Sequence, residues 1–172
     1  MDMRLFIAIN FNEDTRARLV ALRDELRFRS ECGNFSLPEN LHLTLAFLGE
    51  CSARQMAGAK DSLDFLQFAP LSIMIERIGN FQGGLWWAGV KLTTQLLGLQ
   101  RELSDALKKR GFALENRKFS PHITIGRNII TDVMPWSIEP FGETIGAISL
   151  MKSERVNGKL NYTKIHSKPA DD

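Results

Sequence analysis

Two stretches of the sequence carry a repeated pattern that fixes how their side chains are arranged. The first reads NLHLTLAFLGE over 40–50, and the second reads SPHITIGR over 120–127. In both, a histidine and a threonine two positions later interrupt a row of aliphatic residues. Alternation of this kind predicts a β-strand with one buried face and one polar face.

In the first stretch, His42 and Thr44 share one face of the predicted strand, because residues i and i+2 point the same way about 6.6 Å apart. Leu43, Leu45 and Phe47 take the other positions. We therefore expect these three to face the core, with Gly49 ending the strand.

In the second stretch, His122 and Thr124 alternate with Ile123 and Ile125 in the same way. The two histidines stand 80 residues apart, a spacing that indicates an approximate internal duplication of a lobe. If two such lobes pack around a pseudo-twofold axis, their polar faces meet across one cleft with two imidazoles and two hydroxyls.

The other elements follow from hydrophobic periodicity and from turn and cap residues. Asn12, Ser52 with Gln55, and either Thr93 or Thr94 are expected helix N-caps, and Gly111 is expected just past the end of the third helix. The second half of the chain starts near residue 71, and the last residues, 167–172, are expected to be a frayed tail. Strands are predicted at 4–9, 41–48, 71–81, 85–92, 122–127, 143–154 and 159–165.

This order predicts an α+β fold in a single domain, 1–172. We expect a bilobal molecule with two mainly antiparallel sheets related by a pseudo-twofold axis around a central cleft, and helices on the outer faces.

The composition restricts the class of protein. Of 172 residues, 44% are hydrophobic and 24% are charged, and the net charge is +2, as in a soluble globular protein. The apolar run at 5–9 is too short for a signal peptide or a membrane span, and two cysteines make no disulfide framework. We expect a cytoplasmic monomer that makes no contact with a membrane.

Paired histidines suit acid–base chemistry. An imidazole titrates near pH 6.5, so one of a pair can be protonated while the other is neutral, as general acid and general base require. Two threonine hydroxyls can donate to two oxygens of one phosphoryl group. Two other interpretations stay open: two structural histidines, or a metal site, although no HxH, HExxH or cysteine pair supports metal binding.

The stretches RLFIAINF, NLHLTLAFLGE and FSPHITIGR, in this order and over nearly the whole chain, resemble the two-histidine phosphoesterase superfamily. Within it, the sequence is most similar to the RNA 2′,3′-cyclic phosphodiesterases, also called LigT-like or 2′–5′ RNA ligase proteins. The resemblance implies RNA with a 2′,3′-cyclic phosphate end as substrate, such as a tRNA fragment, or a nucleotide. It also implies a reaction without metal or cofactor, with minor 2′–5′ ligation.

The resemblance assigns roles to particular residues. His42 would be the proton donor and His122 the proton acceptor, while Thr44 and Thr124 would bind the phosphoryl oxygens. Arg127, at the end of the second motif, resembles the family pattern and is expected to bind phosphate, although on a regular strand it would point away from His122.

Two further expectations concern base stacking and the choice of substrate. Trp136, expected in the loop MPWSIEP, is the candidate to stack on a base. Two alternative functions remain at this stage. One is a phosphodiesterase acting on small nucleotides, such as ADP-ribose 1″,2″-cyclic phosphate or 2′–5′ oligoadenylate. The other is an RNA-end-binding module without catalysis.

Overall fold

A computed structural model describes residues 2–172. Thirteen elements follow one another along the chain. They are β1 (Met3–Asn10), α1 (Glu13–Phe28), β2 (Cys32–Phe35), the 3₁₀ helix η1 (Pro38–Asn40), β3 (His42–Cys51), α2 (Ala53–Phe65), β4 (Leu71–Phe81), β5 (Leu85–Val90), α3 (Thr94–Lys109), β6 (His122–Ile130), β7 (Trp136–Ile145), β8 (Ala147–Val156) and β9 (Lys159–Pro169).

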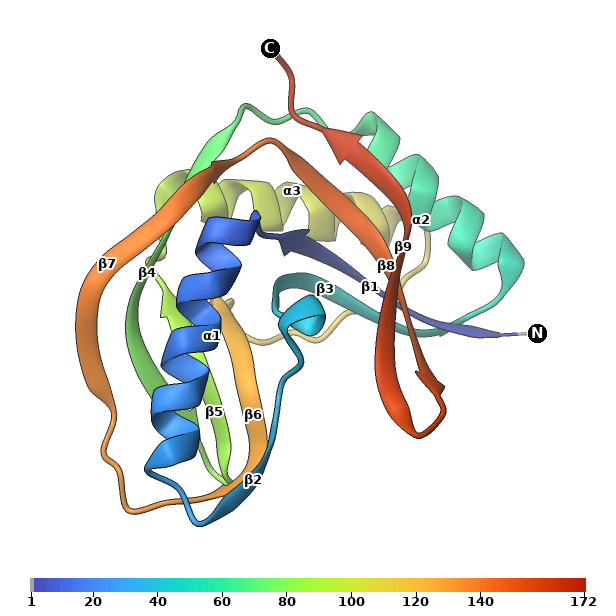
Figure 1. The fold of residues 1–172 in the computed structure, drawn as a ribbon. Coiled ribbons are helices and arrows are strands. Elements are labelled where there is room, and N and C mark those ends of the chain that lie inside the picture. Colours follow the sequence, from blue (N-terminus) through green and yellow to red (C-terminus); the bar gives the residue numbers. More distant parts are fainter. Residues whose placement is uncertain (1) are drawn as a thin grey trace.

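The strands form two sheets, with the orders β3-β1-β8-β9 and β2-β6-β5-β4-β7. Every neighbouring pair is antiparallel, which confirms the α+β class and the two antiparallel sheets. Figure 1 shows the sheets side by side, with the β8–β9 hairpin reaching past the rest of its sheet. None of the helices in this described part of the chain has the length and hydropathy of a membrane span.

The sheets do not follow the two halves of the sequence. β8 and β9 come from the C-terminal end but pair beside β1, and β2 comes from the N-terminal half but pairs with β6. Each sheet therefore contains strands from both halves of the sequence. Strand pairing over such long separations depends on burial in the folded molecule, which local patterns do not encode.

The helices begin and end where the cap residues predict. Asn12 accepts a hydrogen bond from the Thr15 amide, and Ser52 and Gln55 form a complete capping box. Thr93 caps α3, and Gly111 follows this helix with a φ of 90°. These bonds satisfy amide groups that the first turn of a helix leaves free.

The helices pack on the aliphatic faces of the sheets. α1 lies against β2, β6 and β7, α2 lies against β3 and β9, and α3 lies against α2 and β3. Their buried residues join the strand residues in one hydrophobic core that spans both sheets. The helices therefore leave the opposite, polar faces free to line a cleft.

Several boundaries differ from the sequence prediction. β3 runs through Gly49, which has a φ of 74°, and ends at Cys51. The predicted strand 143–154 is two strands that meet at Gly146, and β7 begins at Trp136, so the loop expected there was wrong. Residues 167–169 belong to β9, and the amide of Asp171 bonds to Phe68, so the tail is paired and not frayed.

Candidate active site

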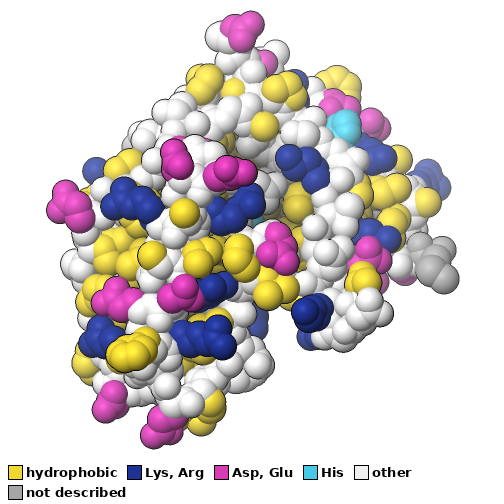
Figure 2. Space-filling view, viewed as in Figure 1, with side chains coloured by type: hydrophobic (Ala, Val, Ile, Leu, Met, Phe, Trp, Pro, Cys, Tyr) yellow, Lys and Arg dark blue, Asp and Glu magenta, His cyan; other side chains and the backbone are white. Residues whose placement is uncertain are grey.

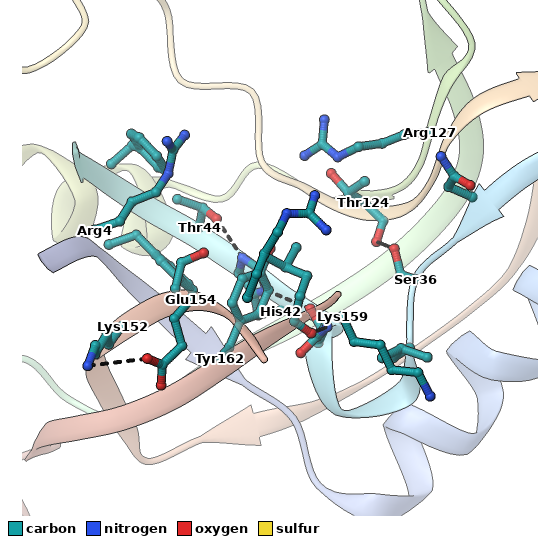
Figure 3. Close-up of a pocket in the computed structure, with 18 of the residues that line it drawn as sticks. Arg4, Ser36, His42, Thr44, Thr124, Arg127, Lys152, Glu154, Lys159 and Tyr162 are labelled. Atoms are coloured by element: carbon teal, nitrogen blue, oxygen red, sulfur yellow. Dashed lines mark hydrogen bonds and ion pairs between the residues drawn. The ribbon is translucent and has the colours of Figure 1, made fainter. Parts of the chain in front are cut away.

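A cleft of about 1530 Å³ lies between the two sheets, and all four motif side chains line it. His42 and Thr44 come from β3, while His122 and Thr124 come from β6, the neighbouring strand in the other sheet. Figure 3 shows the β3 pair and Thr124 on facing sides of this space. Residues that lie 80 positions apart in the sequence thus face one cavity.

The alternation predicted from the sequence is present around both histidines. Leu43, Leu45, Ile123 and Ile125 are at most 3% exposed. The histidines and threonines between them are only partly buried. Each strand thus uses one row of side chains for the core and the other row for the cleft.

Each histidine is held by the same backbone bond. Nδ1 of His42 lies 2.7 Å from the carbonyl oxygen of Asn40, and Nδ1 of His122 lies 2.7 Å from that of Ser120. A carbonyl oxygen only accepts, so Nδ1 carries the proton and donates it in both rings. In a neutral ring of this tautomer, Nε2 is the basic nitrogen that remains free for chemistry.

Aromatic rings fix the plane of both imidazoles. The ring centroid of His42 lies 4.8 Å from that of Phe6 and 5.1 Å from that of Tyr162. For His122, the corresponding neighbours are Phe81 at 5.3 Å and Trp87 at 6.3 Å. Bond and rings together leave each imidazole little freedom to turn, which preorganises Nε2.

The two histidines differ in their surroundings. Nε2 of His42 lies 2.9 Å from the hydroxyl oxygen of Thr44, which donates to it. Burial lowers the pKa of His42 below 6.5, the bond to Asn40 acts in the opposite direction, and the charges of Arg127 and His122 lower it further. His42 is therefore neutral in the free protein at pH 7.

A β-bulge follows each histidine at the same offset. In β3, Thr44 and Ala46 pair with successive residues of β1, so Leu45 has no partner. In β6, Thr124 and Gly126 pair with successive residues of β5, so Ile125 has none. One extra residue reverses the alternation beyond it, which turns the fifth residue after each histidine to the cleft.

This reversal brings two side chains into the cleft. Arg127, which a regular strand would point away from His122, lines the cleft beside Thr124 (Figure 3). Phe47, expected in the core, is 48% exposed and also lines the cleft. The side-chain direction predicted from alternation was wrong for Phe47, because nothing in the local sequence marks Leu45 as the extra residue of a bulge.

Trp136 does not reach the cleft. It lies in β7 opposite Ile78, and its ring packs 6.3 Å from the buried Trp86 and 5.6 Å from the guanidinium of Arg29. It belongs to the residues packed against the core. The structure therefore gives no basis for base stacking on Trp136.

The electrostatic character of the cleft suits an anion. The cleft is lined by six Lys or Arg residues and by three Asp or Glu residues, whereas the net charge of the whole chain is only +2. Figure 2 shows basic side chains on both sides of the notch between the lobes. No group of three or more His, Cys, Asp or Glu residues within 2–172 is arranged to hold a metal ion.

Comparison with known proteins agrees with this geometry. The model of the LigT-like phosphoesterase family matches residues 9–91 and 89–160. The chain is 33% identical over 151 residues to the RNA 2′,3′-cyclic phosphodiesterase of Archaeoglobus fulgidus, with 82% of this chain and 85% of the relative covered. It is 35% identical to that of Thermotoga maritima, with 73% and 70% covered.

Among solved structures, the fold matches Escherichia coli LigT in complex with 3′-AMP. The TM-score is 0.89 at 25% identity, and 100% of each chain is covered. The similarity therefore extends over both sheets and the cleft between them.

The state of His42 can be tested by titration. We expect its pKa in the folded protein to lie below 6.5 because burial disfavours the charged ring. Between the folded and unfolded pKa values the unfolded chain binds more protons, so the free energy of unfolding falls as the pH drops through this window. Inorganic phosphate in the cleft should raise the pKa, since an anion favours the charged ring.

The measurement is an NMR titration of the imidazole resonances, with His42→Gln identifying the signal. A pKa at or above 6.5 in the free protein would contradict the burial argument.

Proposed function

The chain belongs to the LigT-like phosphoesterase family, and we propose that it hydrolyses the 2′,3′-cyclic phosphate at the 3′ end of RNA to a 2′-phosphomonoester. One observation carries the proposal. Two imidazoles whose Nδ1 atoms are held by the backbone, two threonine hydroxyls and the guanidinium of Arg127 face one basic cleft. The names of the relatives support the same reaction.

The proposed reaction moves two protons in opposite directions. Nε2 of His122 takes a proton from water as the water oxygen attacks phosphorus. The P–O3′ bond then breaks, and Nε2 of His42 gives its proton to the departing O3′. The assignment of His42 as proton donor and His122 as proton acceptor rests on the family resemblance. In-line attack requires the acid and the base on opposite sides of phosphorus, and the two histidines lie on strands of different sheets.

The low pKa of His42 fits the role of acid once substrate is bound. The free protein holds the ring neutral. A phosphate anion beside it favours the imidazolium form, so the proton arrives with the substrate. An imidazolium whose intrinsic pKa is low gives up its proton readily, which helps the expulsion of an alkoxide.

Thr44, Thr124 and Arg127 would bind the non-bridging phosphoryl oxygens. Hydroxyl and guanidinium donors near these atoms stabilise the charge that grows on them in the transition state. The Thr44 hydroxyl, which donates to His42 in the free protein, would turn to a phosphoryl oxygen when that ring becomes charged. An RNA 5′-hydroxyl in place of water would give 2′–5′ ligation at the same site.

We expect His42→Ala and His122→Ala each to lower kcat for 2′,3′-cyclic AMP by about 10²–10⁴, the contribution of one general acid or base. The matched control is His166→Ala, since His166 bonds to Asp64 at 2.7 Å and does not line the cleft. Thermal unfolding monitored by circular dichroism checks that all three variants fold. A near-wild-type rate in either cleft variant would refute the proposed mechanism.

Phe47 provides an aromatic surface for the terminal base. Stacking of a base on an aromatic ring contributes about 1–3 kcal/mol. Phe47→Ala should therefore raise KM for 2′,3′-cyclic AMP about tenfold and change kcat far less. Phe65→Ala, at a 78% exposed position outside the cleft, is the control. An unchanged KM in the Phe47 variant would exclude this contact.

A further inference from the structure

Two arginines in the cleft take no part in the proposed reaction. Arg4 lies on β1 two positions before Phe6, and the intervening Leu5 is fully buried, so Arg4 is on the cleft face of its strand. Arg155 lies on β8, two positions beyond Ser153, which pairs with Tyr162. All of these residues except Leu5 line the cleft.

Both arginines line the same cleft as Tyr162, and their charges act on its hydroxyl. Burial raises the pKa of Tyr162, and the positive charges of Arg127, Arg4 and Arg155 act against it. Arg4, Arg127 and Arg155 come from three strands, β1, β6 and β8, and line the same cleft as this phenol. Figure 3 shows Arg4 and Tyr162 on the same side of the cleft as His42, with Arg127 across from them.

Neither arginine is neutralised by a carboxylate. The ion pairs found among residues 2–172 do not include Arg4 or Arg155. Glu154, the nearest acid in sequence to Arg155, is 3.4 Å from Lys152 instead. Glu50 pairs with Arg4 in the strand register, but the two side chains form no ion pair.

Weak contacts hold both arginines in the cleft. The guanidinium of Arg4 lies 5.1 Å above the ring of Phe47, and Nη1 of Arg155 lies 3.3 Å from the carbonyl oxygen of Gly158. A guanidinium has five N–H donors, so most of the donors of each remain available. Unpaired guanidinium groups held in this way are suited to bind a phosphate.

We propose that Arg4, Arg155 and the Tyr162 hydroxyl form a second phosphate subsite, which binds the phosphate on the 5′ side of the terminal nucleotide. The inference rests on the proposed function, in which the cyclic phosphate lies between the histidines. Consecutive RNA phosphates are joined through a single ribose, so both must fall in the same cleft. Tyr162 contacts His42, which places the subsite next to the proposed proton donor.

The subsite has a consequence for substrate choice. An RNA end carries a phosphate on the 5′ side of its last nucleoside, whereas adenosine 2′,3′-cyclic phosphate has a free 5′-hydroxyl. The protein should therefore prefer RNA ends, or 5′-phosphorylated nucleotides, over the simple cyclic nucleotide. Charge-assisted hydrogen bonds of this kind correspond to about a 10- to 100-fold gain.

The test compares three substrates: adenosine 2′,3′-cyclic phosphate, its 5′-phosphate, and the dinucleotide ApA ending in a cyclic phosphate. In the wild-type protein, kcat/KM should be about 10- to 100-fold higher for the latter two. In Arg4→Ala/Arg155→Ala, the ratio of kcat/KM between these two substrates and adenosine 2′,3′-cyclic phosphate should fall toward 1. The change should come chiefly from a lower kcat/KM for the two substrates that carry a phosphate on the 5′ side. Tyr162→Phe should lose part of the preference. KM for the dinucleotide should depend less steeply on salt in the double arginine variant, which lacks two positive charges, and should keep its salt dependence in Tyr162→Phe.

Arg101→Ala, on the exposed face of α3, is the matched control and should keep the preference. Equal kcat/KM for all three substrates in the wild-type protein, or a full preference in the double variant, would overturn the inference. No turnover of any substrate would instead refute the proposed function. Arg4→Lys/Arg155→Lys should keep part of the preference, which separates loss of charge from loss of fold.

Discussion

The cleft depends on the register of β3 and β6. Each strand buries one row of aliphatic side chains and turns the other row to the cleft. Burying a leucine or isoleucine contributes about 1.5–3 kcal/mol, so a one-residue slip that exposes two of them costs about 3–6 kcal/mol. Because a whole domain is stable by about 5–15 kcal/mol, the core itself keeps His42 and His122 facing the cleft.

Within that register, the two halves of the site are similar but not equivalent. Both imidazoles donate Nδ1–H to the carbonyl two residues earlier, and both strands bulge three residues later. The fifth residue is Phe47 on one side and Arg127 on the other. The two walls of the cleft therefore present different groups to a ligand at these equivalent positions.

Sequence reasoning succeeded where the interactions are local. Alternation predicted which faces of β3 and β6 are buried, and Asn12, Ser52 and Thr93 cap the helices as expected. The interleaving of β2, β8 and β9 was missed, because partners far apart in sequence leave no local signal. Phe47 was wrongly expected in the core, because the alternation of side chains reverses beyond a β-bulge. The similarity of the two motifs was the one hint in the sequence that both strands have a bulge at the same position.

In the proposed reaction, acid and base from two sheets act on opposite sides of one phosphorus atom and expel the 3′ oxygen. The most direct measurement identifies the product of 2′,3′-cyclic AMP hydrolysis by ³¹P NMR. We expect the wild-type protein to form 2′-AMP alone, and we expect this product to be lost in both His42→Ala and His122→Ala. Formation of 3′-AMP, or of equal amounts of both isomers, would contradict it.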